Sequence, residues 1–214
     1  MLRAEHLLIE QEPTAAATLF GDRIEVARQY TADLVEHGET LGLIGPQELS
    51  RIWSRHVVNC GLVAPLIRRG GRVADVGSGA GLPGLVLALA VPETSFILIE
   101  PMERRVAWLN EESERLGLQN VTVLRARAEE ARLPRPVDQV TARAVSALRT
   151  LVPNSRGLLS VGGEMLFLKG ASVQDEIEAA RKQLLKAGIK EPEVLVLGEE
   201  IGAEPTRVFR ATVV

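Results

Sequence analysis

Val73-Ala74-Asp75-Val76-Gly77-Ser78-Gly79-Ala80-Gly81-Leu82-Pro83-Gly84 is the stretch that decides the fold of this 214-residue chain. An apolar, partly β-branched run leads into glycines at alternate positions, and a helix-forming segment, residues 85–90, follows at once. This pattern predicts a strand, a tight loop and the N-terminus of a helix. Glycines let such a loop adopt positive φ and approach a ligand closely, and the free N–H groups of the helix offer donors. The sequence therefore predicts a site for a nucleoside-like cofactor.

The residues around the loop distinguish between cofactors. The dinucleotide fingerprint requires a third glycine three positions after the second, and Leu82 stands there, so NAD is disfavoured. Asp75, just before the turn, suits a ligand with an amino group or a positive charge. A second apolar run, Ser95–Ile99, ends at Glu100, which can accept hydrogen bonds from both hydroxyls of a ribose. A ribose, an amino acid and a sulfonium together describe S-adenosylmethionine, which is the cofactor we expect.

Composition excludes several classes of protein. Apolar residues make up 46% of the chain, enough to fill the core of one domain with a smaller attachment. Cys60 is the single cysteine, which argues against a disulfide framework and fits a reducing compartment. His6, His37 and His56 show no spacing typical of a metal site. Without a signal-peptide or membrane-spanning pattern, we expect a cytoplasmic protein with neither metal nor membrane partner. The sequence leaves the oligomeric state open, with a monomer as the simplest expectation.

Charge is distributed unevenly along the chain. The net charge is −3, yet residues 49–174 hold sixteen basic and eleven acidic residues, whereas residues 1–48 hold three basic and nine acidic ones. No acid lies between Glu48 and Asp75, where five arginines occur: Arg51, Arg55, Arg68, Arg69 and Arg72. Such a local excess can neutralise phosphates of a nucleic acid. The alternative is that these arginines pair with acids of the N-terminal segment.

The order of expected elements defines the fold class. Helical spacing of apolar residues predicts a helix over 14–36 broken near Gly21, with Asp22 capping its second part, and another helix from Pro46 that continues to Arg69. Strands and helices then alternate, which predicts an α/β, Rossmann-like, mostly parallel sheet. The strands begin at Arg72 and continue over 95–99, 121–124, 137–141, 164–168, 193–197 and 207–213. Helices are expected over 83–90, 102–116, 146–160 and 172–187, and the last two strands should form an antiparallel hairpin at the sheet edge.

Ligands of open parallel sheets bind beyond the carboxyl ends of the strands. The residues expected at that edge are Gly77, Ser78, Gly79, Gly81, Leu82, Glu100, Ala128, Glu129, Arg143 and Lys169. Glu129 follows the third strand and can accept a hydrogen bond from the adenine amine, although a helix cap or a partner for Arg127 would explain it equally simply.

The residues that follow the fourth predicted strand limit the atoms to which a methyl group could be transferred. Thr141-Ala142-Arg143-Ala144-Val145-Ser146 has none of the prolines or aromatic residues used in methylation of exocyclic amines. Methylation of pyrimidine C5 needs a cysteine nucleophile, and Cys60 lies upstream on an apolar helix face. A ring nitrogen such as guanine N7 attacks a methyl group directly and releases no proton, so positioning suffices. The absence of an obvious general base is therefore consistent with a ring nitrogen such as guanine N7 as the acceptor.

Four residues are candidates for positioning that acceptor. Arg143 and Lys169 can hold guanine O6 or nearby phosphates, and a structural ion pair or a solvated strand end are their alternatives. Arg55 and His56 precede the first strand. His56 could stack on a base or bind a phosphate, but a single histidine on a mixed face is more often a packed residue.

Several of these motifs occur together in one known family. They are Arg55-His56, Asp75–Gly84, Arg105, Arg127–Glu130, Arg143-Ala144 and Leu168-Lys169-Gly170. From about Gly21 to its C-terminus the chain resembles the RsmG family, also called GidB, the bacterial 16S rRNA (guanine-N7) methyltransferases. The resemblance implies a class I S-adenosylmethionine-dependent methyltransferase domain over 70–214 and a helical, RNA-facing extension over 1–69. It also implies cofactor contacts by Gly77, Leu82, Ala128, Glu129 and Arg143, with Arg55, His56 and Lys169 on the RNA or catalytic face, and the small ribosomal subunit or an assembly intermediate as partner.

Two departures from the family pattern concern the RNA side of the site. The connector that often reads Asn-Leu-Thr is here Gly42–Pro46, and an acid often found three residues after the histidine is here Asn59. Two other functions are compatible with the same fold: a small-molecule methyltransferase, and an RNA-binding ribosome assembly factor without turnover.

Overall fold

The computed structural model describes residues 8–214 and contains one seven-stranded sheet. His6 lies outside the described residues. The strand order is β3-β2-β1-β4-β5-β7-β6. The strands are β1 (Arg72–Val76), β2 (Ser95–Ile99), β3 (Val121–Leu124), β4 (Val137–Arg143), β5 (Leu159–Lys169), β6 (Glu193–Leu197) and β7 (Thr206–Thr212). Strands β1 to β5 pair in parallel, while β7 is antiparallel to both β5 and β6. The α/β class, the mostly parallel sheet and the C-terminal hairpin are thus confirmed.

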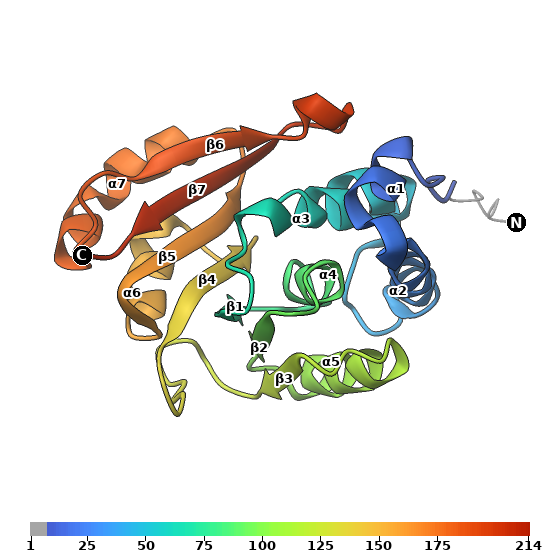
Figure 1. The fold of residues 1–214 in the computed structure, drawn as a ribbon, viewed down its shortest axis with the longest axis horizontal. Helices are drawn as coiled ribbons and strands as arrows, with labels where there is room; N and C mark the ends of the chain where they lie inside the picture. The colour runs from blue at the N-terminus through green and yellow to red at the C-terminus, as the bar shows by residue number, and fades with distance from the viewer. Residues whose placement is uncertain (1–7) are drawn as a thin grey trace, which may run out of the picture.

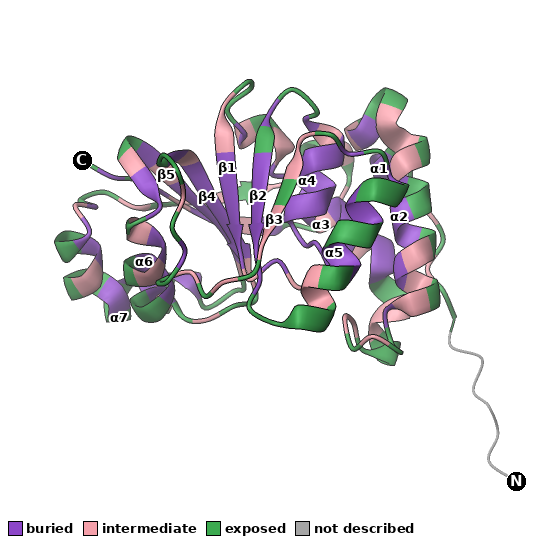
Figure 2. Ribbon diagram, turned by 90° about the horizontal axis from the view of Figure 1, so that it is seen from below, coloured by how far each residue is buried: buried purple, intermediate pink, exposed green. Residues whose placement is uncertain are grey.

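Helices cover both faces of the sheet (Figures 1 and 2). One face packs against α3 (Asn59–Gly61), α4 (Gly84–Ala90) and α5 (Glu103–Arg115), with α1 (Thr14–Phe20) and α2 (Ile24–His37) farther out. The other face packs against α6 (Leu148–Arg156) and α7 (Val173–Lys186). Strand β2 is buried from both sides, as Figure 2 shows, which explains its continuous apolar run from Phe96 to Ile99.

The N-terminal helices share their hydrophobic core with the sheet. Phe20, Tyr30 and Ile52 belong to the same buried cluster as Leu85 of α4 and Leu98 of β2. Burial of such side chains contributes roughly 1.5–3 kcal/mol each. Packing therefore joins the segment before β1 to the sheet, and a domain boundary between residues 69 and 70 stays a prediction.

Two buried hydrogen-bond donors connect α2 and α5 to the glycine loop, residues 77–82. Tyr30 Oη of α2 donates a hydrogen bond to the Ala80 carbonyl at 3.1 Å, and Trp108 Nε1 of α5 donates to the same oxygen at 2.9 Å. A carbonyl oxygen has two lone pairs, so it can accept both bonds. The loop is therefore supported from two helices at one atom.

The segment from Pro46 to Arg69 differs from the expected single helix. It consists of a 3₁₀ helix η2 (Pro46–Arg51), a π helix η3 (Ile52–Val58), α3 and a short 3₁₀ helix η4 (Ala64–Leu66). Ile67 is extended, with φ −75° and ψ 128°, so the prediction of helix up to Arg69 was wrong. Pro65 lies within η4 and lacks the N–H group that a longer helix would need. Helical spacing in the sequence predicts one stripe of Leu49, Ile52, Trp53, His56, Val57 and Cys60; the last five are buried and Leu49 is half-buried.

Some element boundaries also moved. Gly21, with φ 48°, separates α1 from the next turn as expected, but no side-chain cap by Asp22 begins α2. Helix α6 begins only at Leu148, because Ala147 is extended, and it ends before Gly157. Within residues 8–214, no helix has both the length and the apolar character that a bilayer crossing requires.

Candidate active site

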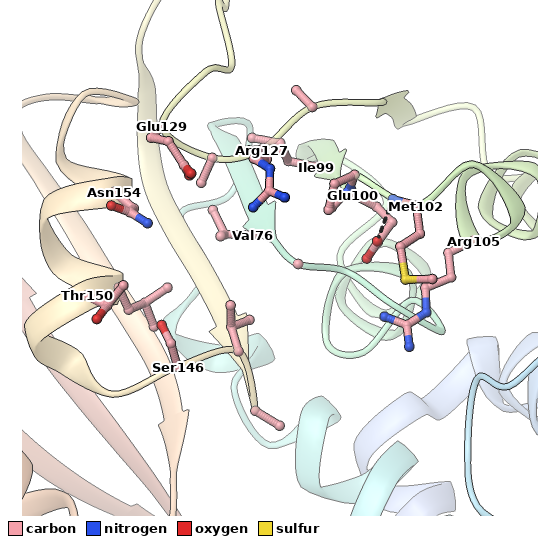
Figure 3. Close-up of a pocket in the computed structure, with 17 residues that line it drawn as sticks. Val76, Ile99, Glu100, Met102, Arg105, Arg127, Glu129, Ser146, Thr150 and Asn154 are labelled. Atoms are coloured by element: carbon pink, nitrogen blue, oxygen red, sulfur yellow. Dashed lines mark hydrogen bonds between the residues drawn. The ribbon is translucent and has the colours of Figure 1, made fainter.

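A crevice of about 400 Å³ lies beyond the carboxyl ends of β1, β2 and β4 (Figure 3). One wall comes from Glu100, Met102 and Arg105, and the opposite wall from Ser146, Thr150 and Asn154. The turn after β3 contributes Ala126, Arg127, Ala128 and Glu129, and Val76, Gly77, Ile99, Pro101, Ala144, Val145 and Leu151 complete the lining. The crevice is therefore assembled from four strand ends and two helices, α5 and α6, at the edge where parallel sheets bind ligands.

Gly77 keeps the floor of the crevice free of side chains. Its φ is +68°, and a Cβ there would lie 2.8 Å from Cγ2 of Val145. Its N–H donates to the Ile99 carbonyl at 2.8 Å, which fixes the turn against β2. Only glycine combines this backbone conformation with this close approach.

Glu100 lies at the tip of β2 and lines the crevice while holding the loop. Its side chain accepts hydrogen bonds from the backbone N–H groups of Gly79, at 3.0 Å, and Met102, at 2.9 Å. Figure 3 shows the second of these bonds. Each carboxylate oxygen retains a further lone pair, so the group can still accept hydrogen bonds from a ligand.

Asp75 takes a position different from the one expected for a ligand contact. It is fully buried, and its oxygens accept hydrogen bonds from Thr141 Oγ1 at 2.9 Å and from the Gly84 N–H at 3.1 Å. Burial raises its pKa to about 7, against hydrogen bonds from Ser78, Thr141 and Gly84 that favour the charged form. The geometry therefore gives Asp75 a structural contact between β4 and the start of α4, with no position in the crevice lining.

The other residues of the glycine loop also differ in whether they line the crevice or are buried behind it. Gly77 faces the crevice, whereas Ser78, Gly81 and Leu82 are buried behind it. Ser78 Oγ donates to the Asp75 carbonyl at 3.0 Å, and Leu82 packs in the core. Gly79 is half-buried and contacts Glu100 through its N–H.

A second opening of about 260 Å³ adjoins the crevice at Ala144, which lines both. It is lined by Arg55, Asn59, Arg143, Ala144, Leu168, Lys169, Gly170 and Glu176. Ala144 has φ +54°, the one positive value among described non-glycine residues. Residues in this conformation cluster at functional sites because surrounding structure must hold them there.

Arg143 and Lys169 face the second opening. Arg143 Nη1 donates to the Arg55 carbonyl at 3.1 Å, and Nη2 lies 2.7 Å from His56 Nδ1. Lys169 Nζ donates to the Ser146 carbonyl at 3.0 Å and lies 2.7 Å from a carboxylate oxygen of Glu176. The structure thus brings Arg55, His56, Arg143 and Lys169 together, but Arg143 does not line the crevice to which the resemblance assigns it.

His56 is almost fully buried, at 6% exposed. Its Nε2 lies 2.7 Å from Glu48 Oε2, on the side opposite Arg143. Burial and the charge of Arg143 lower the pKa of His56 to about 4, although Glu48 opposes the shift. The imidazole is therefore neutral at pH 7 and is packed within a hydrogen-bond network.

The arginines before β1 are largely neutralised. Arg51 pairs with Glu204, Arg55 with Glu48, Arg68 with Asp138 and Arg69 with Glu93, and Arg72 donates to the carbonyls of Arg135 and Pro136. Four of the five arginines pair with acids, but only Glu48 belongs to the N-terminal segment that the alternative named. The carboxylates are spread over the whole chain because the fold brings distant segments together.

Several crevice residues escaped the sequence analysis. Val145, Thr150 and Asn154 form the wall after β4, and Met102 belongs to the opposite wall. Thr150 and Asn154 are four residues apart and share one face of α6, a spacing that could have indicated them, whereas Ser146 precedes that helix. Glu129 is exposed at the crevice and does not pair with Arg127. Across residues 8–214, no group of three or more His, Cys, Asp or Glu could hold a metal ion.

Comparison with solved structures shows the fold. The structure resembles TrmN from Thermus thermophilus, with a TM-score of 0.58 and 23% identity over 85% of this chain and 53% of that one. It also resembles M. jannaschii TYW2 in complex with AdoMet, with a TM-score of 0.57 and 19% identity over 74% and 76%. At these identities the likeness concerns the fold alone, which is that of class I S-adenosylmethionine-dependent methyltransferases.

Comparison of sequences shows the family. A protein from Leifsonia xyli subsp. xyli, named ribosomal RNA small subunit methyltransferase G, is 60% identical over 96% of this chain and 98% of its own length. One of the same name from Clavibacter michiganensis subsp. michiganensis is 56% identical over 98% and 99%. The GidB family model, described as rRNA small subunit methyltransferase G, matches residues 23–204. The chain belongs to the GidB family of rRNA small subunit methyltransferases G.

Proposed function

We propose that this protein transfers a methyl group from S-adenosylmethionine to N7 of a specific guanine in 16S rRNA, within the small ribosomal subunit or one of its assembly intermediates. Membership of the family supports ribosomal RNA of the small subunit as the substrate. The observation that carries the proposal is the juxtaposition of two openings that share Ala144, one suited to an adenosyl donor and one lined by cationic donors.

The crevice has the features that S-adenosylmethionine requires. Gly77 lines the crevice without a side chain, and Glu100 stands at the tip of the neighbouring strand, where a ribose can donate to it. Ala128 and Glu129 lie where an adenine would meet backbone groups and a carboxylate. Glu129 is exposed and free of Arg127, which supports its assignment to the adenine amine. When bound, S-adenosylmethionine supplies a methyl group on a sulfonium sulfur, so that an N7–CH₃ bond forms as the S–CH₃ bond breaks and the positive charge passes to the purine.

The second opening suits an acceptor that loses no proton. Arg55, Arg143 and Lys169 are donors, and a guanine presents the O6 acceptor beside N7. His56 is buried with both ring nitrogens engaged, so it is unsuited to removing a proton from a substrate. Methylation of N7 needs none to be removed, since the lone pair attacks directly. The role proposed for these side chains is therefore to hold the base and its phosphates.

The test is methyl transfer from labelled S-adenosylmethionine to naked 16S rRNA, to small subunits and to assembly intermediates, each in parallel. Digestion to nucleosides followed by mass spectrometry should find label as 7-methylguanosine. Label at another atom of guanine would overturn the assignment to N7 and leave the family untouched. Label in protein or a small metabolite alone would contradict an RNA substrate. The rate should fall as salt rises, because phosphate contacts weaken.

A further inference from the structure

Glu48, His56 and Arg143 form one continuous chain of polar contacts. Glu48 belongs to η2, His56 to η3 and Arg143 to the end of β4, so the chain joins the N-terminal segment to the strand tip between the two openings. The contacts are Glu48 Oε2 to His56 Nε2 at 2.7 Å and His56 Nδ1 to Arg143 Nη2 at 2.7 Å. Nothing in the sequence pattern had indicated Glu48.

Donor and acceptor chemistry fixes the protons of this chain. A guanidinium can only donate, so His56 Nδ1 must accept from Arg143 and therefore carries no proton. The imidazole is neutral, which places its proton on Nε2, where it is donated to Glu48. Although burial opposes the shift, the hydrogen bond from His56 and the charge of Arg55 hold the pKa of Glu48 below its usual value. Glu48 is thus a charged acceptor at pH 7.

The charged groups that face His56 come from three elements: Glu48 from η2, Arg55 from its own helix and Arg143 from β4. Glu48 also lies 3.4 Å from Arg55 Nε. One carboxylate therefore contacts, directly or through His56, two of the three cationic side chains of the second opening. Arg143 has two nitrogens committed to these contacts, which restricts the directions in which its guanidinium can point.

We propose that Glu48 is a positioning residue for methyl transfer: by accepting the His56 Nε2 proton it holds Nδ1 toward Arg143 and fixes the guanidinium beside Ala144, where the two openings meet. This inference rests on the proposed function for its kinetic consequence. The hydrogen-bond chain itself is independent of the substrate. A displacement of a positioned group by about 1 Å can lower a rate by about a hundredfold, so loss of this contact should be visible in the transfer step.

The experiment compares Glu48→Ala and Glu48→Gln with a matched control, Glu204→Ala. Glu204 pairs with Arg51, which belongs to η2 like Glu48, so the control also removes a carboxylate that contacts this helix. Single-turnover transfer to the RNA substrate should slow about ten- to a hundredfold for Glu48→Ala, because Arg143 loses its fixed direction. Glu48→Gln should stay within about threefold of the wild type, since the amide oxygen accepts the same proton. Glu204→Ala should match the wild type, and all variants should keep their affinity for S-adenosylmethionine in calorimetry.

A spectroscopic readout tests the chain without turnover. Side-chain ¹⁵N NMR of the three histidines should show His56 with its proton on Nε2 and uncharged between pH 5.5 and 8, as burial predicts. Glu48→Gln should retain the chemical shifts of His56 Nε2 and its proton, whereas Glu48→Ala should change them, because the Nε2 proton loses its acceptor. A wild-type His56 that is charged at pH 7 or protonated on Nδ1 would overturn the proposal, as would a wild-type rate for Glu48→Ala.

If Glu48→Ala fails to fold, Glu48→Asp keeps the charge but is too short to reach His56, and it should also slow transfer about tenfold. A wild-type rate for Glu48→Asp would then sink the proposal. Failure of the wild type to methylate any RNA would remove the proposed function, while the NMR signature would still decide whether Glu48 fixes His56.

Discussion

Two carboxylates near the glycine loop look equivalent in the sequence and differ in the fold. Glu100 reaches the crevice, while Asp75 points inward to Thr141 and Gly84. Sequence analysis could place both at strand ends but could not tell which side of the backbone each would take, because that depends on the packing of α4 against β1. The expectation for Glu100 thus stays a prediction, now with a suitable position, and that for Asp75 loses its geometric support.

Gly77 offers the sharpest test at the scale of a residue. In Gly77→Val the side chain would meet Val145, since even a Cβ lies 2.8 Å from it, and positive φ would add about 1–2 kcal/mol of strain. We expect the affinity for S-adenosylmethionine to fall more than about tenfold while the folded state persists. Calorimetry measures the affinity, and circular dichroism follows the fold. Gly157→Ala, where a Cβ would meet nothing within 4 Å, is the matched control. Unchanged cofactor affinity in Gly77→Val would mean that the crevice is not the cofactor site.

At the scale of elements, α2 and α5 act on the glycine loop through one atom, the Ala80 carbonyl. The sequence indicated helices at both places, but it could not show that Tyr30 and Trp108 converge. Such convergence arises only when distant segments pack together. Both helices therefore support the shape of the crevice through this carbonyl, and α5 also lines it with Arg105.

The substitution Tyr30→Phe tests how much α2 contributes to the shape of the glycine loop. The ring stays in place and one hydrogen bond to Ala80 is lost, so the free energy of unfolding should fall by about 1 kcal/mol. Affinity for S-adenosylmethionine should fall by about two- to fivefold, because the loop loses one of its two supports. Urea unfolding and calorimetry measure the two effects. A loss of stability with no change in affinity would show that Trp108 alone fixes the loop.

Helices α2 and α5 also enclose a buried acid. Glu112 is fully buried, and burial together with the charge of Asp33 raises its pKa to about 8, although Arg115 opposes the shift. The folded protein keeps this proton between about pH 4.5 and 8 while the unfolded chain releases it. Stability therefore decreases as pH rises through that window, by about 1.4 kcal/mol per pH unit for this group. Below the window the group contributes no pH dependence.

Glu112→Gln should remove that slope. The difference in free energy of unfolding between the variant and the wild type should be small at pH 4.5 and should grow in favour of the variant up to pH 8. Chemical unfolding at several pH values provides the measurement. Parallel curves for the two proteins would mean that Glu112 is ionised in the folded state.

At the scale of the whole molecule, the pattern of apolar residues and the positions of the glycines sufficed to predict the sheet and its C-terminal hairpin. Apolar runs such as Ser95–Ile99 report burial, and glycines such as Gly117 and Gly188 mark helix ends. What they could not predict depends on distant partners: the carboxylates that pair with Arg51 and Arg68, the π helix around His56, and the contribution of α6 to the crevice. The sequence predicted the part of the site that the strand–turn–helix motif around Gly77 forms. It did not predict the part that polar residues of α6 form, Thr150 and Asn154.

The shared core makes a prediction for a truncated chain. A fragment of residues 70–214 would expose the α4 face that now packs against Phe20, Tyr30 and Ile52. We expect this fragment to lack cooperative unfolding and dispersed amide NMR signals under conditions where the full chain shows both, because exposed apolar area of this size opposes folding. A well-dispersed spectrum from the fragment would instead support the boundary between residues 69 and 70.

Ala144 lines both openings, so the sites proposed for the methyl donor and for the guanine meet at this residue. A guanine in a duplex would have to leave the base stack before it could enter such a site, which costs a few kcal/mol. RNA with the target guanine in an open loop should consequently react faster than the same guanine locked in a hairpin stem, and equal rates would refute this. With only the methyl side chain of Ala144 at the meeting point of the two proposed sites, the expected substrate is RNA whose target guanine is unpaired.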